Sequence, residues 1–128
     1  MEKNIISKRF TFSSAHYLPD HKNCGVLHGH NWGLEVSVIG DINEKGMVVD
    51  FHKMKEIVKE EVIGDADKNR LLDHNFLNEF IPEIVPTCEN LAKWIWNKLE
   101  LQFEAIGVEL YCIKINETED SYFSYYGE

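Results

Sequence analysis

The order of apolar and polar residues divides the chain into six expected secondary-structure elements. Alternation with a period of two indicates half-buried β-strands, whereas apolar residues three and four positions apart indicate helices with one buried face. We expect strands over residues 5–15, 28–39, 108–116 and 121–126, and helices over residues 50–64 and 86–99. The predicted order is β-β-α-α-β-β, which is typical of an α+β domain whose antiparallel four-stranded sheet carries two helices on one face.

Parity along the first two strands places three histidines on the face that carries the apolar side chains. In the first strand, Phe10 and Phe12 share one face, and His16 has the same parity. In the second strand, His28 and His30 share the parity of the apolar positions that follow them. A metal-binding face would therefore continue into the core face of the sheet.

Both expected helices have suitable beginnings. Asp50 is a good N-cap for the first helix, which we expect to end at Gly64. Thr87 suits the N-cap of the second helix, and Glu89 falls in its first turn, where the helix dipole favours an anion. The expected buried positions are Phe51, Met54, Ile57, Val58 and Val62 in the first helix and Leu91, Ala92, Ile95 and Leu99 in the second.

Size, composition and charge narrow the class of protein. With 128 residues, of which 44% are hydrophobic, the chain suits a single domain over residues 1–128. It contains no run long and apolar enough to span a membrane and no signal peptide, so we expect a cytoplasmic protein without a membrane partner. The formal net charge of −9 argues against nucleic-acid binding, because phosphate contacts need clustered cations. A small phosphorylated ligand stays possible, since a local cation cluster can hold one.

The three cysteines, Cys24, Cys88 and Cys112, are an odd number and include no C-x-x-C pair. A disulfide framework is therefore not expected, and the thiols should be reduced. Cys24 follows a polar loop and should be accessible, whereas Cys88 and Cys112 are expected to be small core residues.

The stretch from His16 to His30 concentrates side chains that can bind a metal. His16, Cys24, His28 and His30 fall within 15 residues, although the chain has 6 histidines and 3 cysteines in all. Three neutral imidazoles with an open fourth position describe a catalytic zinc centre. The alternative is a closed structural zinc site in which Cys24 is the fourth ligand. A core of this size does not need a metal for stability, which favours the catalytic alternative.

Acidic side chains and a further histidine form a second group of candidates. Asp73 and His74 are adjacent in an irregular segment, residues 69–78, between the expected helices. Taken alone, this pair would be read as a turn cap with a packed imidazole. Glu89 would likewise be read as a residue that complements the helix dipole, and Glu117 as a solvated acid of a turn.

Five separated motifs stand in register along the chain. They are His16, Cys24-x-x-x-His28-Gly29-His30, Leu72-Asp73-His74-x-x-Leu77-Asn78, Pro86-Thr87-x-Glu89 and Asn116-Glu117-Thr118. Together they resemble the family of 6-pyruvoyltetrahydropterin and 6-carboxytetrahydropterin synthases over most of the chain. The resemblance implies the tunnelling fold (T-fold), in which the sheets of several subunits join into a barrel. It also implies a homohexamer built from two trimers, with active sites between subunits.

The resemblance implies three groups of site residues. The implied zinc ligands are His16, His28 and His30, the implied catalytic residues are Cys24, Asp73 and His74, and the implied substrate-binding residues are Thr87, Glu89 and Glu117. Glu117 would anchor the pterin, and Cys24 would act as a general base beside the zinc. Cys88 departs from the family pattern, in which we expect a small hydroxyl residue or alanine.

The resemblance also implies an activity. The family converts 7,8-dihydroneopterin triphosphate to 6-carboxy-5,6,7,8-tetrahydropterin, with release of acetaldehyde and triphosphate. The gap of three residues between Cys24 and His28 is like that of the bacterial 6-carboxytetrahydropterin synthases of the queuosine (7-deazaguanine) pathway. The alternatives are a 6-pyruvoyltetrahydropterin synthase, which eliminates triphosphate at the same metal site, and a non-catalytic protein that binds pterin and zinc.

Overall fold

A five-stranded sheet in the order β5-β1-β2-β6-β7 organises the computed structural model, which describes residues 2–19, 27–65 and 69–128 and, of His28, the backbone. The strands of this sheet are β1 (Asn4–His16), β2 (His28–Gly40), β5 (Asn75–Phe76), β6 (Glu109–Asn116) and β7 (Tyr122–Tyr125). The four longer strands are antiparallel to their neighbours, as predicted, and β5 adds a short parallel pairing at the edge.

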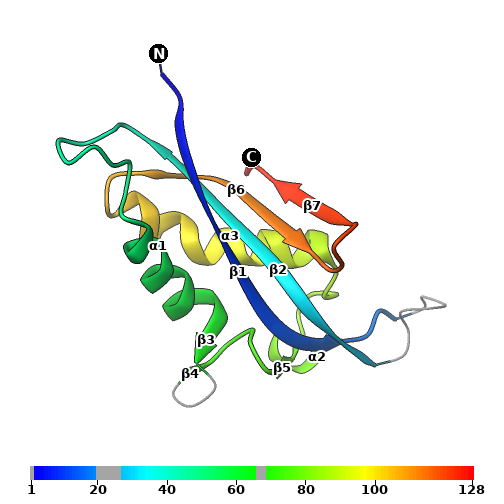
Figure 1. Cartoon of the computed structure of the whole chain (residues 1–128). Helices are drawn as coiled ribbons and strands as arrows, with labels where there is room; N and C mark the ends of the chain where they lie inside the picture. Colours follow the sequence, from blue (N-terminus) through cyan, green and yellow to red (C-terminus); the bar gives the residue numbers. More distant parts are fainter. Residues whose placement is uncertain (1, 20–26, 66–68) are drawn as a thin grey trace.

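The helices lie against one face of this sheet (Figure 1). They are α1 (Phe51–Val58), the π-helix η1 (Lys59–Ile63), α2 (Leu77–Phe80) and α3 (Cys88–Glu104). Two further short strands, β3 (Gly64–Asp65) and β4 (Asn69–Arg70), pair with each other. The predicted α+β order of long elements is confirmed, whereas β4, β5 and α2 lie in or begin in the segment that we expected to be irregular.

The register between β1 and β2 builds the centre of the core. Phe10 pairs with Leu34 and Phe12 pairs with Trp32, and all four side chains are buried. The rings of Phe12 and Trp32 are nearly parallel, with centroids 6.0 Å apart. The predicted apolar face of both strands is therefore confirmed, and it faces the helices because burial of these side chains removes their apolar surface from water.

Both predicted helix caps are confirmed. The carboxylate of Asp50 accepts a hydrogen bond from the backbone N–H of His52 at 2.8 Å, and α1 begins at the next residue. The hydroxyl of Thr87 accepts one from the backbone N–H of Asn90 at 3.1 Å, at the start of α3. These contacts satisfy donors that the first turn of a helix leaves without an intrahelical partner.

The first helix differs from the prediction at both ends. Phe51 is 50% exposed, so its assignment to the buried stripe was wrong. It is the first residue of α1, before the helix reaches the core at Met54. At the other end, the last turn widens into η1 and stops at Gly64, as predicted, where φ is 82°. Glycine adopts this left-handed conformation without strain.

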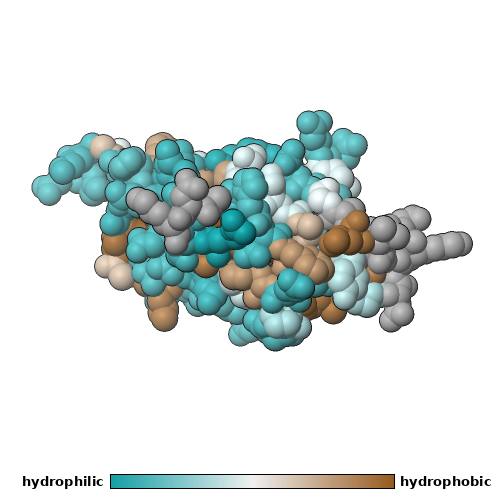
Figure 2. Space-filling model, turned by 90° about the horizontal axis from the view of Figure 1, so that it is seen from below, coloured by the Kyte–Doolittle hydropathy of each residue, from teal (hydrophilic) through white to brown (hydrophobic). Residues whose placement is uncertain are grey.

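The side of the molecule that is seen from below is mainly polar. Most of this side is hydrophilic, and the apolar side chains lie in separate patches (Figure 2). In the part of the chain that the structure describes, no helix is both long enough and apolar enough to cross a membrane.

Candidate active site

His16 and His30 lie side by side at one end of the β1–β2 pair. The register places His30 opposite Ser14 and His16 opposite the backbone of His28. The His16 side chain is fully buried, and that of His30 is 21% exposed. Their imidazole centroids are 5.2 Å apart, and both rings meet the indole of Trp32 nearly at right angles. Trp32 therefore supports the two imidazoles from the core side.

Glu117 joins the two histidines from the end of β6. Leu34 of β2 pairs with Ile115 in the core, so Glu117, two residues further on, points to the same face of the sheet. Its Oε1 lies 2.8 Å from His30 Nε2 and 3.4 Å from His16 Nε2. Among the described residues, these three side chains form the group whose potential ligand atoms all lie within 4.8 Å of one another.

A backbone contact orients the ring of His16. Its Nδ1 lies 2.9 Å from the carbonyl oxygen of Pro86, which can only accept a hydrogen bond. Nδ1 therefore carries a proton, and Nε2, 3.4 Å from Glu117 Oε1, is the nitrogen left to bind a cation. A cation between this nitrogen and the carboxylate would stabilise the arrangement. Imidazole nitrogens and a carboxylate are common ligands of zinc and similar ions, so the residues present fit a metal.

The structure does not describe two further predicted site residues, His28 and Cys24, in full. The backbone of His28 pairs with that of His16, but its side chain lies outside the described residues. Cys24 lies wholly outside them. The predicted roles of these two residues remain predictions.

Asp73 and His74 form a pair that is attached to β1. Asp73 Oδ2 lies 3.0 Å from His74 Nδ1, and Asp73 Oδ1 accepts a hydrogen bond from the backbone N–H of Ser13 at 2.8 Å. The backbone N–H of His74 donates to the carbonyl of Ser13 at 2.6 Å. Among the described residues, His74 is the one non-glycine residue with a positive φ, 59°. Such strain persists where surrounding contacts hold it and is concentrated at functional sites.

A cavity of about 520 Å³ lies between His74 and the face that carries His30. Its lining includes His30 from β2, His74, and the polar side chains of Ser13 and Asn31, which share a hydrogen bond of 2.7 Å. The imidazole of His74 is 62% exposed and can therefore meet a ligand in this space. His74 of the predicted acid–imidazole pair and His30, one predicted metal ligand, thus open onto the same cavity.

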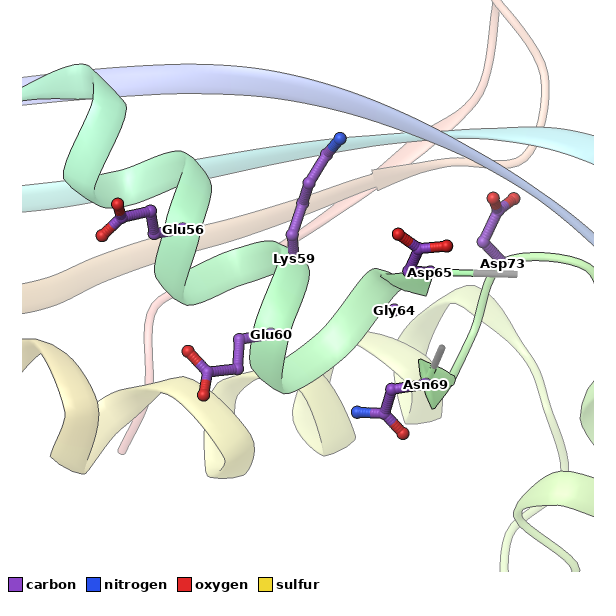
Figure 3. A pocket seen from close by; sticks show the side chains of 7 residues that line it. All are labelled: Glu56, Lys59, Glu60, Gly64, Asp65, Asn69 and Asp73. Carbon is purple, nitrogen blue, oxygen red and sulfur yellow. The ribbon is translucent and has the colours of Figure 1, made fainter. Parts of the chain in front are cut away.

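Asp73 also borders a second cavity, of about 580 Å³, on the side of α1 and η1. Figure 3 shows the carboxylates of Asp65 and Asp73 pointing to the same side as the ammonium group of Lys59, whereas Glu56 and Glu60 point elsewhere. Within the described ranges, these acidic groups do not converge on a metal-sized position as the histidines do. We therefore assign no chemistry to this cavity.

Cys88 is partly buried and packs against the core, as expected, but it also lies next to the histidine–glutamate group. Its Sγ is 3.9 Å from Glu117 Oε2. Burial, with the neighbouring carboxylates of Glu117 and Glu89, raises the pKa of the Cys88 thiol to about 12. Cys88 and Glu117 come together where the first turn of α3 packs against the end of β6. The one signal for this in the sequence was the position of Cys88 inside the Pro-Thr-x-Glu motif. Cys112 is buried, as expected.

Among the described residues, the histidine–glutamate group does not include Thr87 or Glu89. The Thr87 hydroxyl accepts the hydrogen bond from Asn90 that caps α3. Glu89 is exposed in the first turn of the helix. Their substrate-binding roles remain predictions that depend on the resemblance.

Comparison with known proteins gives consistent results. The family model described as 6-pyruvoyl tetrahydropterin synthase matches residues 5–128. A 6-pyruvoyl tetrahydrobiopterin synthase of Dictyostelium discoideum is 40% identical over 139 residues, covering 97% of this chain and 96% of the relative. A 6-carboxy-5,6,7,8-tetrahydropterin synthase of Synechocystis sp. is 38% identical over 128 residues, covering 95% and 92%.

The fold agrees with these sequence comparisons. The structure of 6-pyruvoyl tetrahydropterin synthase from Caenorhabditis elegans matches with a TM-score of 0.82 and 26% identity, over 100% of this chain and 98% of that one. The tunnelling fold predicted for the subunit is therefore confirmed.

Proposed function

The chain belongs to the 6-pyruvoyl tetrahydropterin synthase family, and from this premise we propose that it converts 7,8-dihydroneopterin triphosphate to 6-carboxy-5,6,7,8-tetrahydropterin. Acetaldehyde and triphosphate would be released, and the product would serve queuosine (7-deazaguanine) biosynthesis. The observation that carries this proposal is the convergence of His16 and His30 on Glu117, beside a cavity that His30 shares with His74.

The choice between the two activities of the family depends on the motif Cys24-x-x-x-His28-Gly29-His30. Relatives named for the pyruvoyl and the carboxy product are 40% and 38% identical to this chain, so overall similarity does not decide. The gap of three residues between Cys24 and His28 favours the carboxy product. The 6-pyruvoyl product is the second candidate, because the structural neighbour from Caenorhabditis elegans carries that name.

Zinc is the metal that we propose for this site. His16, His28 and His30 would hold it, since three imidazoles leave a position open for substrate. When bound, zinc would supply a Lewis acid that lowers the pKa of the substrate's side-chain hydroxyls. The carbonyl of Pro86 would keep His16 in the tautomer that can bind it.

The chain's own residues would transfer the protons and bind the pterin ring. Cys24 would accept a proton from the substrate side chain as a general base. Asp73 holds Nδ1 of His74, which leaves Nε2 to exchange a proton with a substrate in the cavity. The carboxylate of Glu117 would accept hydrogen bonds from the guanidine-like edge of the pterin.

We also propose a homohexamer with active sites between subunits. In the described chain, β5 pairs with β1 at Ser14 and Ala15, so the preceding residues of β1 lie along an edge of the sheet, and β7 forms the opposite edge. Sheet edges of this kind are commonly covered by association. Light scattering should give six times the subunit mass of 14.9 kDa. A fully active monomer would contradict sites shared between subunits.

Product identification is the experiment that tests the activity. Purified, zinc-loaded protein is incubated with 7,8-dihydroneopterin triphosphate, and the pterins and acetaldehyde are quantified by chromatography and mass spectrometry. We expect 6-carboxy-5,6,7,8-tetrahydropterin and acetaldehyde in equal amounts. A 6-pyruvoyl product without acetaldehyde would establish the second candidate instead.

A further experiment separates the enzyme from a non-catalytic protein that binds pterin and zinc. Under the proposed mechanism, Cys24→Ala abolishes turnover while zinc stays bound. In a closed structural site, the same substitution removes a ligand, so zinc would be lost or the domain would unfold. Zinc content and circular dichroism of this variant decide between the two.

A further inference from the structure

We propose that Cys88 is a positioning residue that holds the carboxylate of Glu117 in its orientation within the site. This inference deepens the proposed function and rests on it, because Glu117 is there the residue that anchors the pterin. Cys88 would not touch the substrate. It would act through Glu117 alone.

The two oxygens of Glu117 make different contacts. Oε2 lies 3.9 Å from Cys88 Sγ, within reach of a hydrogen bond that a thiol donates. Oε1 lies 2.8 Å from His30 Nε2 and 3.4 Å from His16 Nε2. The contact with sulfur on one oxygen therefore helps to fix the plane of the carboxylate, with its other oxygen toward the imidazoles. A glutamate side chain has three rotatable bonds, so a contact at its far end restricts its orientation.

Cys88 is itself held by the start of α3. It is the first residue of the helix, directly after the N-cap Thr87, whose hydroxyl binds the N–H of Asn90. The carbonyl of Pro86, two residues before Cys88, contacts Nδ1 of His16. A single short segment of the chain therefore touches both a buried imidazole and the carboxylate that faces it.

This arrangement gives Cys88 a role that packing alone does not explain. The thiol is only partly buried, yet its sulfur lies against a carboxylate rather than against apolar side chains alone. Cys112, the other described cysteine, is buried in β6 and makes a matched comparison. Removing the donor at position 88 should change the orientation of Glu117, whereas shortening Cys112 should not.

The first test compares crystal structures of the metal-free parent protein, Cys88→Ala and Cys88→Ser. Serine keeps a donor at this position, and alanine does not. We expect a carboxylate oxygen of Glu117 to stay beside His30 Nε2 in the parent and in Cys88→Ser, and the carboxylate to turn away in Cys88→Ala. An unmoved carboxylate in Cys88→Ala overturns the proposal. This test does not depend on turnover, so it still decides the role of Cys88 if the parent forms no pterin product and the proposed function fails.

The second test uses kinetics with 7,8-dihydroneopterin triphosphate on the zinc-loaded proteins. Loss of one hydrogen bond that positions an anchor should raise KM roughly three- to tenfold in Cys88→Ala and leave kcat nearly unchanged. Cys88→Ser should restore the parent KM, and Cys112→Ala should not alter it. Circular dichroism confirms that each variant is folded. A serine variant no closer to the parent than the alanine variant overturns the proposal, because only a donor distinguishes the two.

Discussion

His16 Nδ1 lies 2.9 Å from the carbonyl oxygen of Pro86, so the last residue of β1 is tied to the segment that begins α3. The direction of His16 Nε2 therefore depends on how this helix packs on the sheet as well as on the strand. Loss of a group that hydrogen-bonds a metal ligand typically lowers metal affinity by roughly 10- to 100-fold. The proposed zinc site is thus coupled to the packing of α3.

His30→Ala removes one of the proposed zinc ligands. We therefore expect zinc affinity to fall by more than the roughly 10- to 100-fold that is typical when a residue that only hydrogen-bonds a ligand is lost. Calorimetric titration of zinc into the metal-free variant measures this change. His52→Ala is the matched control, since that imidazole is 75% exposed on α1 beside Glu56. If both variants bind zinc as the parent does, His30 is not a ligand.

Glu117→Gln separates two roles for this side chain, the pterin anchor and a fourth metal ligand. Glutamine keeps the size of the side chain but removes its charge. We expect the anchor role, with KM raised roughly 10- to 100-fold through loss of a charge-assisted hydrogen bond and zinc affinity retained. Steady-state kinetics and zinc titration give both values, with Glu119→Gln as the control. A variant that no longer retains zinc would identify Glu117 as a ligand.

Local patterns predicted which faces of the strands carry the histidines. Alternation is a property of the backbone itself, so the shared face of His16 and His30 followed from their parity with Phe12 and Trp32. The contact between Glu117 and these histidines could not be predicted in the same way. It requires the register between β2 and β6, which depends on contacts between segments far apart in the chain.

The short elements were missed for a similar reason. β5 has two residues, and its place is set by pairing with Ser14 and Ala15 of β1 rather than by its own sequence. The position of Cys88 beside Glu117 likewise depends on how α3 packs against β6. The helix caps at Asp50 and Thr87, in contrast, depend on contacts within three residues and were predicted correctly.

Gly64→Ala should destabilise the fold by about 2–4 kcal/mol, because it combines backbone strain with a steric clash. Gly64 has φ of 82°, and a Cβ there would lie 2.3 Å from the carbonyl oxygen of Asn69 and 2.5 Å from the backbone nitrogen of Leu71. Gly46→Ala is the matched control, since its φ is also 82° but its Cβ would meet nothing within 4 Å. Urea unfolding gives both free energies. Equal losses in the two variants would show that the clash at Gly64 relaxes.

Asp73→Asn should reduce kcat roughly 10²- to 10⁴-fold while zinc stays bound, because the amide is a poorer partner for a protonated His74 and the imidazole loses its orienting charge. The contact of Asp73 Oδ1 with the Ser13 N–H can persist through the amide oxygen, so the fold should be retained. Asp65→Asn is the control, since Asp65 lines the second cavity beside Asp73 but not the one that contains His74. Single-turnover kinetics, zinc content and circular dichroism separate these effects. A variant with parent kcat would remove the Asp73–His74 pair from the proposed proton transfer and leave that role to another group at the cavity.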